Sequence, residues 1–298
     1  MHLFVFIFVL LMGCLPQFCW ASPLKVAVSI LPQKYFVERI GGDRVAVEVM
    51  IPPGANPAVY DPKPDQLRKL SECQLYFAVR VPFEGVWVQK FRSMYSSLEV
   101  VDVTEGMELM NMAAHTHADA DESHAHEHHH HEAGLKDPHV WLSPPYAALM
   151  AKNMLNAMMR KDPENASYYK ANYERLSSEI AALDLELQKR FSRHAKSGPR
   201  KFMVFHPAWG YFAKTYGLIQ LPVELEGKEP KPAQLEKFIQ LAQKEGLKVI
   251  FVQPQFSKRS AEVIAEAIGA RLVTLDPLAY DWFKTLREAA QAFDEYAK

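Results

Sequence analysis

The chain has little cysteine, almost no net charge and no motif of the common phosphate-binding or nucleophilic sites. It holds 3 cysteines in 298 residues, and 34 Lys and Arg residues nearly balance 35 Asp and Glu residues, for a net charge of −1. Without a basic excess to neutralise phosphates, we do not expect it to bind nucleic acid. No GxxxxGK[ST], GxSxG or Cys-x-x-Cys pattern occurs, so nucleotide hydrolysis, serine-hydrolase chemistry and dithiol redox chemistry lack their signatures.

The first 21 residues differ from the rest of the chain. The apolar run from Leu3 to Gly13 is shorter than the roughly 20 residues that a membrane-spanning helix needs. Pro16 and a small-residue site that ends at Ala21 follow, so we expect a signal peptide over residues 1–21 and an exported, periplasmic or otherwise extracytoplasmic protein. A lipid anchor at Cys14 is the less favoured alternative. Cleavage leaves Cys73 as the single thiol, which we expect to be a small buried residue without a disulfide.

Past this leader, short β-branched runs alternate with helical patterns, which is typical of an α/β fold with parallel sheets covered on both faces. We expect strands over 24–30, 45–51, 75–79, 99–103, 201–205, 218–223, 249–252 and 271–275. Helical spacing occupies 34–40, 65–70, 145–160, 164–194, 209–216, 232–245, 258–268 and the chain from about 282. We interpret this order as an N-terminal α/β lobe over 22–143, a linking helical segment over 144–194 and a C-terminal α/β lobe over 195–298. The two lobes show no convincing sequence repeat.

The segment 115–132 is made almost entirely of His, Ala, Asp and Glu. It has no apolar residue larger than alanine, so it cannot bury a core, and we expect a loop within the N-terminal lobe. Adjacent imidazoles bind zinc but add little for manganese. Its eight histidines are candidate zinc ligands: His115, His117, His124, His126, His128, His129, His130 and His131.

Three further candidate ligands lie outside this segment. His206 directly follows the apolar run over 201–205, and Asp276 directly follows the run over 271–275. In open α/β sheets, ligands bind beyond the carboxyl ends of strands. His139 lies in Asp-Pro-His-Val-Trp-Leu, just before the long helices. Two imidazoles and a carboxylate form a set that suits zinc, and also manganese or ferrous iron.

Other polar and aromatic residues receive structural interpretations. The carboxylates of Glu224, Glu226 and Glu229 are expected to form a solvated run on a loop. Four aromatic residues are expected to line the cleft or fill the core: Trp141, Trp209, Tyr211 and Phe212.

Several short motifs follow one another along the chain. They are VSILP at 28–32, IPPGANP at 51–57, YDP at 60–62, the acidic histidine segment, DPHVWL at 137–142, HPAWGYF at 206–212 and LDPL at 275–278. In this order they resemble the cluster A-I solute-binding proteins, the metal-binding components of ATP-driven zinc and manganese importers, from about Leu24 to the C-terminus. The resemblance implies two α/β lobes joined by a rigid helix, a metal held between them, and a membrane permease as the partner of what we expect to be a monomer.

The resemblance also assigns the metal ligands. His139, His206 and Asp276 match the family's second, third and fourth ligands. The first ligand is normally a histidine after Asn-Pro, but this chain has Ala58 there, and alanine cannot coordinate a metal. The open position is left to water, to Tyr60 or Asp61, or to a histidine of segment 115–132.

The function expected from these observations is capture of zinc and its delivery to a membrane importer, with no enzymatic activity. Histidine at position 206, where manganese-type relatives carry a carboxylate, favours zinc over manganese or iron. A manganese- or iron-binding member of the same family is one alternative. A zinc-dependent hydrolase that uses the open position to activate water is another, and a metal buffer without a transporter is a third.

Overall fold

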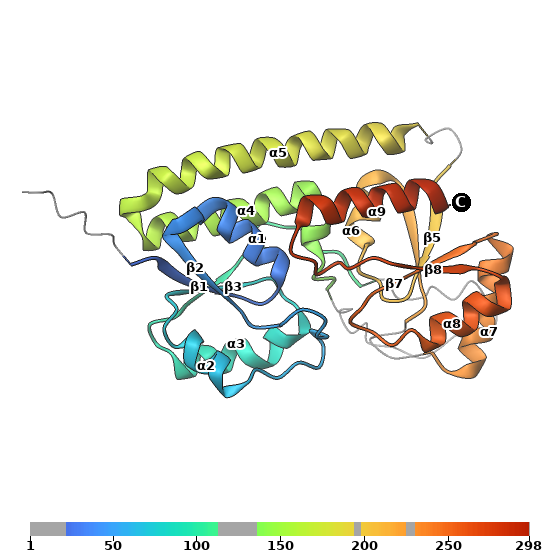
Figure 1. The fold of residues 1–298 in the computed structure, drawn as a ribbon, viewed down its shortest axis with the longest axis horizontal. Coiled ribbons are helices and arrows are strands. Elements are labelled where there is room, and N and C mark those ends of the chain that lie inside the picture. Colours follow the sequence, from blue (N-terminus) through green and yellow to red (C-terminus); the bar gives the residue numbers. More distant parts are fainter. Residues whose placement is uncertain (1–21, 113–135, 194–197, 225–229, 298) are drawn as a thin grey trace, which may run out of the picture.

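The computed structural model describes residues 22–112, 136–193, 198–224 and 230–297. They form two α/β lobes side by side, with one long helix running along both (Figure 1). Each lobe has a four-stranded parallel sheet, as the sequence predicts. No helix in these four ranges is both long and apolar enough to cross a membrane.

The N-terminal lobe contains the first sheet, with strand order β2-β1-β3-β4. Its strands are β1 (Leu24–Val28), β2 (Val45–Val49), β3 (Leu75–Ala78) and β4 (Glu99–Asp102). The central strands β1 and β3 are almost fully buried, because helices cover both faces of the sheet. These helices include α1 (Leu31–Gly41), α2 (Pro64–Leu70) and α3 (Pro82–Met94).

The C-terminal lobe repeats this arrangement, with strand order β6-β5-β7-β8. Its strands are β5 (Arg200–Val204), β6 (Leu218–Pro222), β7 (Val249–Val252) and β8 (Arg271–Thr274). Its helices include α6 (Gly210–Tyr216), α7 (Pro232–Lys244) and α8 (Arg259–Ile268). The lobes therefore share a topology although their sequences show no repeat.

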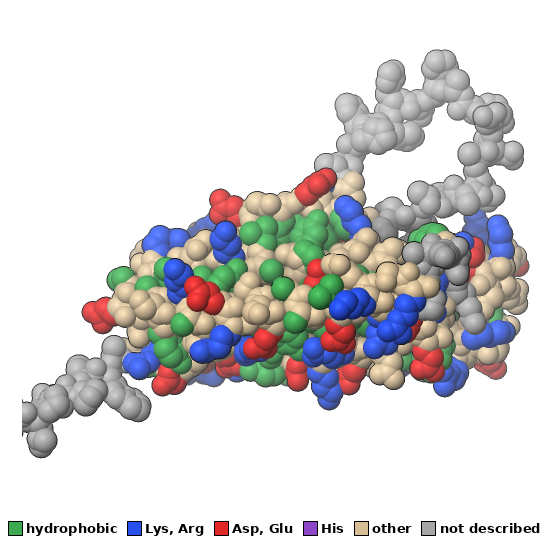
Figure 2. All heavy atoms as spheres, turned by 90° about the horizontal axis from the view of Figure 1, so that it is seen from above, with side chains coloured by type: hydrophobic (Ala, Val, Ile, Leu, Met, Phe, Trp, Pro, Cys, Tyr) green, Lys and Arg blue, Asp and Glu red, His purple; other side chains and the backbone are tan. Residues whose placement is uncertain are grey.

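Two helices link the lobes along the chain, α4 (Pro144–Lys161) and α5 (Ala166–Ser192), and the chain ends in α9 (Trp282–Tyr296), which packs against α5. The 27-residue α5 contacts α1 and α4 at one end and α6 and α9 at the other. Its buried residues recur at helical spacing, and they join one hydrophobic core that includes Val26 of the first sheet and Phe251 of the second. Figure 2, which looks onto the α5 side, shows Lys and Arg interspersed with Asp and Glu, with no area of a single sign.

Most sequence-based elements are confirmed, with ends that differ by one to three residues. Cys73 is buried and free, as expected, and burial raises the pKa of its thiol to about 12. Trp141, Trp209, Tyr211 and Phe212 are all fully buried in the core. Helix α3 was not predicted. Three short 3-10 turns, at Gly42–Arg44, Val140–Leu142 and Pro163–Asn165, complete the described elements.

Candidate metal centre

Two of the predicted ligands meet between the lobes. His139 immediately precedes the 3-10 turn Val140–Leu142, and His206 lies two residues beyond the end of β5. Their Nε2 atoms are 3.3 Å apart, although 67 residues separate them in the chain. The linking helical segment lies between these two histidines in the sequence, and the fold brings their imidazoles together.

A buried carboxylate supports each imidazole on its far side. Asp137 Oδ1 accepts hydrogen bonds from His139 Nδ1 at 2.7 Å and from the His139 backbone N–H at 2.9 Å. Glu224 Oε2 accepts a hydrogen bond from His206 Nδ1 at 2.8 Å. The side chains of Asp137 and Glu224 are each only 2% exposed. This carboxylate–imidazole arrangement is the usual support of metal-binding histidines, because it fixes the ring and makes its free nitrogen more basic.

The hydrogen bonds determine which nitrogen of each ring is free. An ionised carboxylate only accepts hydrogen bonds, so both Nδ1 atoms carry a proton, and in the neutral rings both Nε2 atoms present lone pairs. Two lone pairs 3.3 Å apart repel each other unless a cation lies between them. Zinc bound at about 2.0–2.1 Å to each of two nitrogens in tetrahedral geometry would separate them by about 3.3–3.4 Å. The distance between the histidines matches that value.

The surroundings of His206 keep its imidazole neutral. Burial lowers its pKa, and the hydrogen bond from Nδ1 to Glu224, which opposes this shift, does not reverse it. The ring stacks on Phe256, with centroids 4.4 Å apart and planes at 20°. Because only a neutral imidazole can coordinate a metal, this environment preserves the ligand form.

Buried amide and indole groups fix the backbone on both sides of the pair. Gln253, directly after β7, accepts a hydrogen bond from the His206 N–H and donates one to the His206 carbonyl, both at 3.1 Å. Trp141 donates from its indole to the Pro277 carbonyl at 2.8 Å, and Trp282 donates to the Trp141 carbonyl at 2.5 Å. The segments that carry His139 and Asp276 are thereby tied to each other.

Asp276 directly precedes Pro277, whose carbonyl Trp141 holds, but it does not join the histidines as a third close ligand. Its Oδ1 accepts hydrogen bonds from Gln255 Nε2 at 2.6 Å and from the Leu278 N–H at 2.9 Å. Across the four described ranges, no three His, Cys, Asp or Glu side chains come close enough together to hold a metal.

The other candidate ligands lie elsewhere. Tyr60 donates its hydroxyl hydrogen to Gln66 at 2.6 Å, and Asp61 accepts from the indole of Trp87 at 3.1 Å. Neither residue lines the cavity of about 50 Å³ beside His139 and His206, whereas Ala58 does. The eight histidines from His115 to His131 fall outside the described residues.

Glu224 was predicted to lie in a solvated run of carboxylates, and this prediction is wrong. The side chain of Glu224 is buried and bonds to His206. Glu226 and Glu229 lie outside the described residues. Sequence reasoning also missed Gln253 and Gln255, because it looked only for imidazoles and carboxylates. One signal could have revealed all three residues, since each follows the carboxyl end of a strand of the second sheet, as His206 and Asp276 do.

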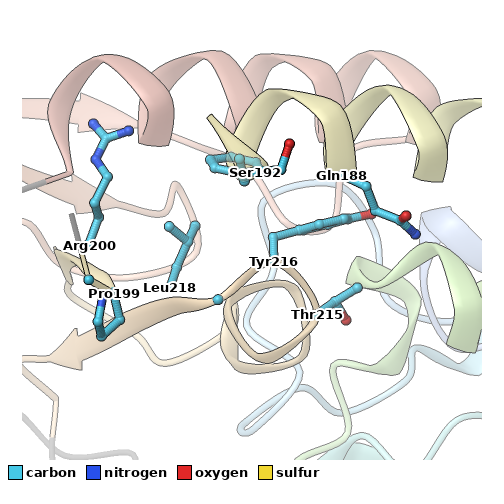
Figure 3. A pocket seen from close by; sticks show the side chains of 10 residues that line it. Gln188, Ser192, Pro199, Arg200, Thr215, Tyr216 and Leu218 are labelled. Carbon is cyan, nitrogen blue, oxygen red and sulfur yellow. The ribbon is translucent and has the colours of Figure 1, made fainter. Parts of the chain in front are cut away.

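A larger cavity, of about 480 Å³, lies at the other end of this sheet, between α5, α6 and the starts of β5 and β6 (Figure 3). Its polar side chains are engaged in the fold. Tyr216 donates to Asp184 at 2.8 Å, and the Arg200 guanidinium points away to the Asp294 and Ala297 carbonyls, each at 2.7 Å. None of its lining side chains is an imidazole or a carboxylate, so it offers no metal ligands comparable to the histidine pair.

Comparisons with known proteins identify relatives of this chain. Residues 26–296 match the family model described as zinc-uptake complex component A, periplasmic. The high-affinity zinc uptake system protein ZnuA of Bacillus subtilis is 33% identical over 260 residues, which cover 86% of this chain and 78% of that protein. The manganese ABC transporter substrate-binding lipoprotein PsaA of Streptococcus pneumoniae is 22% identical over 257 residues, covering 83% and 77%.

A solved structure gives the same result for the fold. The crystal structure of a ZnuA deletion mutant with zinc bound is 35% identical, covers 92% of this chain and 98% of its own, and superposes with a TM-score of 0.81. The family match spans nearly all residues of both lobes, including both histidines and the carboxylates behind them. This chain belongs to the ZnuA family of periplasmic metal-binding components of ABC importers.

Proposed function

We propose that this protein captures zinc outside the cytoplasm and delivers it to the membrane permease of an ABC importer. The observation that carries the proposal is the pair of imidazoles whose Nε2 atoms lie 3.3 Å apart, each supported by a buried carboxylate. Nitrogen ligands at this spacing fit zinc. The zinc-uptake relatives support the same cargo.

His139 and His206 are the proposed primary ligands, and Asp276 is the proposed third. Its carboxylate belongs to the Asp276–Leu278 turn, whose Pro277 and Leu278 line the same cavity as the histidines. Gln255 holds Asp276 Oδ1 in that wall. The imidazole ligands at positions 139 and 206 favour zinc over manganese, which prefers carboxylate and water ligands.

Export and transport complete the proposal. Residues 1–21, the proposed signal peptide, lie outside the described residues, as does Cys14, the less favoured site of a lipid anchor. We propose that the mature chain acts as a monomer, with lobes over 22–143 and 195–298 and linking helices over 144–194. Its family supports an ABC importer as the partner.

The histidine segment 115–132 is proposed to collect zinc near the site. The segment itself falls outside the described residues. The residues that border it are described, and they lie beside the histidine pair. Met112 and Pro138 both line the cavity, and Asn111 pairs with Lys136 in a short antiparallel bridge. Zinc held by neighbouring histidines there would be released next to the tight site.

The test is zinc titration of the metal-free mature chain against a competing chelator at pH 7.5. We expect one tight site and several weaker ones. His206→Ala should weaken the tight site at least 100-fold, Glu245→Gln, whose carboxylate pairs with Lys201, should leave it unchanged, and deletion of residues 115–132 should remove only the weak sites. A chain that retains no zinc, or that prefers manganese, would contradict the proposal; preference for manganese would identify the manganese-type alternative.

A further inference from the structure

The cavity beside the histidine pair has an apolar wall where a metal would need another ligand. It measures about 50 Å³, and Ala58, Val81 and Pro82 of the N-terminal lobe line it together with His139 and His206. The Ala58 side chain is a methyl group, which offers no lone pair. A metal bound to the two Nε2 atoms would therefore have an unfilled coordination position in this space.

On the Ala58 side of the cavity, the described residues offer no free side-chain ligand to fill that position. Tyr60 and Asp61, the nearest polar residues along the chain, are hydrogen-bonded to Gln66 and Trp87 and do not line the cavity. Asn56 does line it, but its Oδ1 accepts a hydrogen bond from the Ala58 N–H at 2.8 Å. Zinc in proteins is almost always four-coordinate, so a ligand from solvent is needed.

Gln255 supplies a second, independent observation. It lines the cavity, is 9% exposed, and donates from Nε2 to Asp276 Oδ1. Its Oε1 is buried and accepts no hydrogen bond from any residue that the structure describes. A buried acceptor without a donor is unfavourable, so this oxygen points to a missing group that carries a hydrogen.

We propose that the position facing Ala58 takes a small neutral ligand from solvent, which coordinates the metal and donates a hydrogen bond to Gln255 Oε1. The inference rests on the proposed metal site at His139 and His206. Water is the ordinary occupant of this position. One water needs about 10–15 Å³, and the cavity of about 50 Å³ has room for it. Ammonia and free imidazole belong to the same class, because each has one lone pair and an N–H. A free amino acid that chelates through two groups is too large.

The first experiment uses the mature chain loaded with one equivalent of Co²⁺, whose visible spectrum reports a change of ligand. Titration with imidazole should give a saturable spectral change. Titration with 1-methylimidazole, which lacks the N–H, should require at least tenfold more ligand. In Gln255→Leu, where the acceptor is missing, this preference should disappear.

The second experiment supplies the missing ligand from the chain. Ala58→His should lower the zinc dissociation constant at least tenfold and abolish the spectral response to imidazole. Val59→His is the matched control, because Val59 is the next residue, is 79% exposed and does not line the cavity. It should bind zinc and respond to imidazole as the unaltered chain does.

Each contrary result has a distinct meaning. Failure to bind Co²⁺ and Zn²⁺ would overturn the proposed function and this inference together. Binding without an imidazole response, with Ala58→His no tighter than Val59→His, would overturn the inference alone. A response that appears only after deletion of residues 115–132 would show that this segment fills the position, and would also overturn it. Equal affinity for imidazole and 1-methylimidazole would show that Gln255 Oε1 accepts no hydrogen bond from the ligand, and would overturn that part of the inference.

Discussion

The carboxylates behind His139 and His206 determine how well these imidazoles can serve as ligands. Each accepts the Nδ1 hydrogen and so leaves a lone pair on Nε2. Asp137 is two residues from its histidine in the chain, whereas Glu224 comes after the end of a different strand, 18 residues from His206. The sequence pattern made Asp137 visible as part of a motif, whereas the signal for Glu224 was only its place just after the end of a strand of the second sheet.

We predict that Glu224→Gln weakens zinc binding about 10–100-fold, the usual effect of altering a carboxylate that supports a metal-binding histidine. A neutral amide can accept the Nδ1 hydrogen but makes the ring less basic. Glu245→Gln is the control, since Glu245 lies in the same lobe and pairs with Lys201 at 2.7 Å. Competition titration with a zinc chelator measures both variants. Equal affinities would mean that Glu224 does not support the ligand.

Gly210 allows Asp137 to occupy its place. A Cβ added at Gly210 would lie 2.9 Å from Asp137 Oδ2, closer than real Cβ atoms come to a neighbour. We predict that Gly210→Ala shifts this carboxylate and weakens zinc binding about tenfold, with the helix itself retained.

The control for Gly210→Ala is Gly85→Ala, because no atom lies within 4 Å of the Cβ that it would add. Isothermal titration with zinc gives the affinities, and circular dichroism checks the helical content. An unchanged affinity for Gly210→Ala would show that Asp137 can move without loss of the site.

At the scale of elements, the turn between β3 and α3 is held by one buried carboxyl group. Glu84 accepts hydrogen bonds from the N–H groups of Val79 and Arg80, at 3.0 and 2.6 Å, and from the Ser29 hydroxyl. Arg80 has a φ of +67°, which is unfavourable for a residue with a side chain. The carboxyl group therefore stabilises a strained turn whose next two residues, Val81 and Pro82, line the cavity beside His139 and His206.

Burial raises the pKa of Glu84 to about 7, despite the opposing hydrogen bonds from Ser29, Val79 and Arg80. The folded state then binds more protons than the unfolded state between about pH 4.3 and pH 7, so this group's contribution to stability falls as the pH rises through that range. The quantity to measure is the free energy of unfolding of the unaltered chain minus that of Glu84→Gln. We predict that this difference falls by up to about 3 kcal/mol from pH 5 to pH 8.

Urea unfolding of the metal-free chain at several pH values measures this difference. Glu72→Gln is the control. Lys25 holds the pKa of that exposed carboxylate below its usual range, so it stays ionised in the folded state above pH 5 and the difference should be nearly flat. A flat difference for Glu84→Gln as well would contradict the prediction.

The elements themselves were largely predictable, and the one missed helix shows why. Strands such as Leu75–Ala78 and Val249–Val252 are continuous apolar runs because they are buried on both faces. Helix α3 does follow one face, because Phe83, Trp87 and Phe91 recur at helical spacing and their rings pack together, with centroids 5.9–6.3 Å apart. Gly85 and the exposed Val86 interrupt the apolar pattern between them and obscured it.

The site was predictable in part, for a related reason. His139, His206 and Asp276 follow strands or recognisable motifs, so the sequence indicates them. The sequence could not indicate that Asp276 would be held by Gln255 instead of meeting the histidines, or that Tyr60 and Asp61 would bond to Gln66 and Trp87. These hydrogen bonds form only when the folded chain packs together residues from different turns or from distant segments, which a local sequence pattern does not show.

At the scale of the molecule, the two lobes share one hydrophobic core through α5. Leu183 is fully buried near the middle of this helix, and α5 contacts elements of both lobes. We predict that Leu183→Ala costs about 2–5 kcal/mol and destabilises both sheets together. Hydrogen exchange should accelerate to a similar extent in β1 and β3 of one lobe and in β5 and β7 of the other.

Leu185→Ala is the control on the same helix, because Leu185 is 51% exposed. It should leave both exchange and the midpoint of thermal unfolding nearly unchanged. If Leu183→Ala accelerated exchange in one sheet only, the lobes would be independent folding units, and the shared core would not couple them.

The bridge between Asn111 and Lys136 has a consequence for how such a protein can change in evolution. Asp137 N–H bonds to the Met110 carbonyl at 2.9 Å, and Tyr211 bonds to both of these residues, at 3.0 Å each. The two chain ends that border residues 113–135 are thus fixed to each other and to α6. Insertions, deletions or new histidines between them need not disturb His139, so the number of histidines in this segment can vary between descendants while the His139 segment is inherited unchanged.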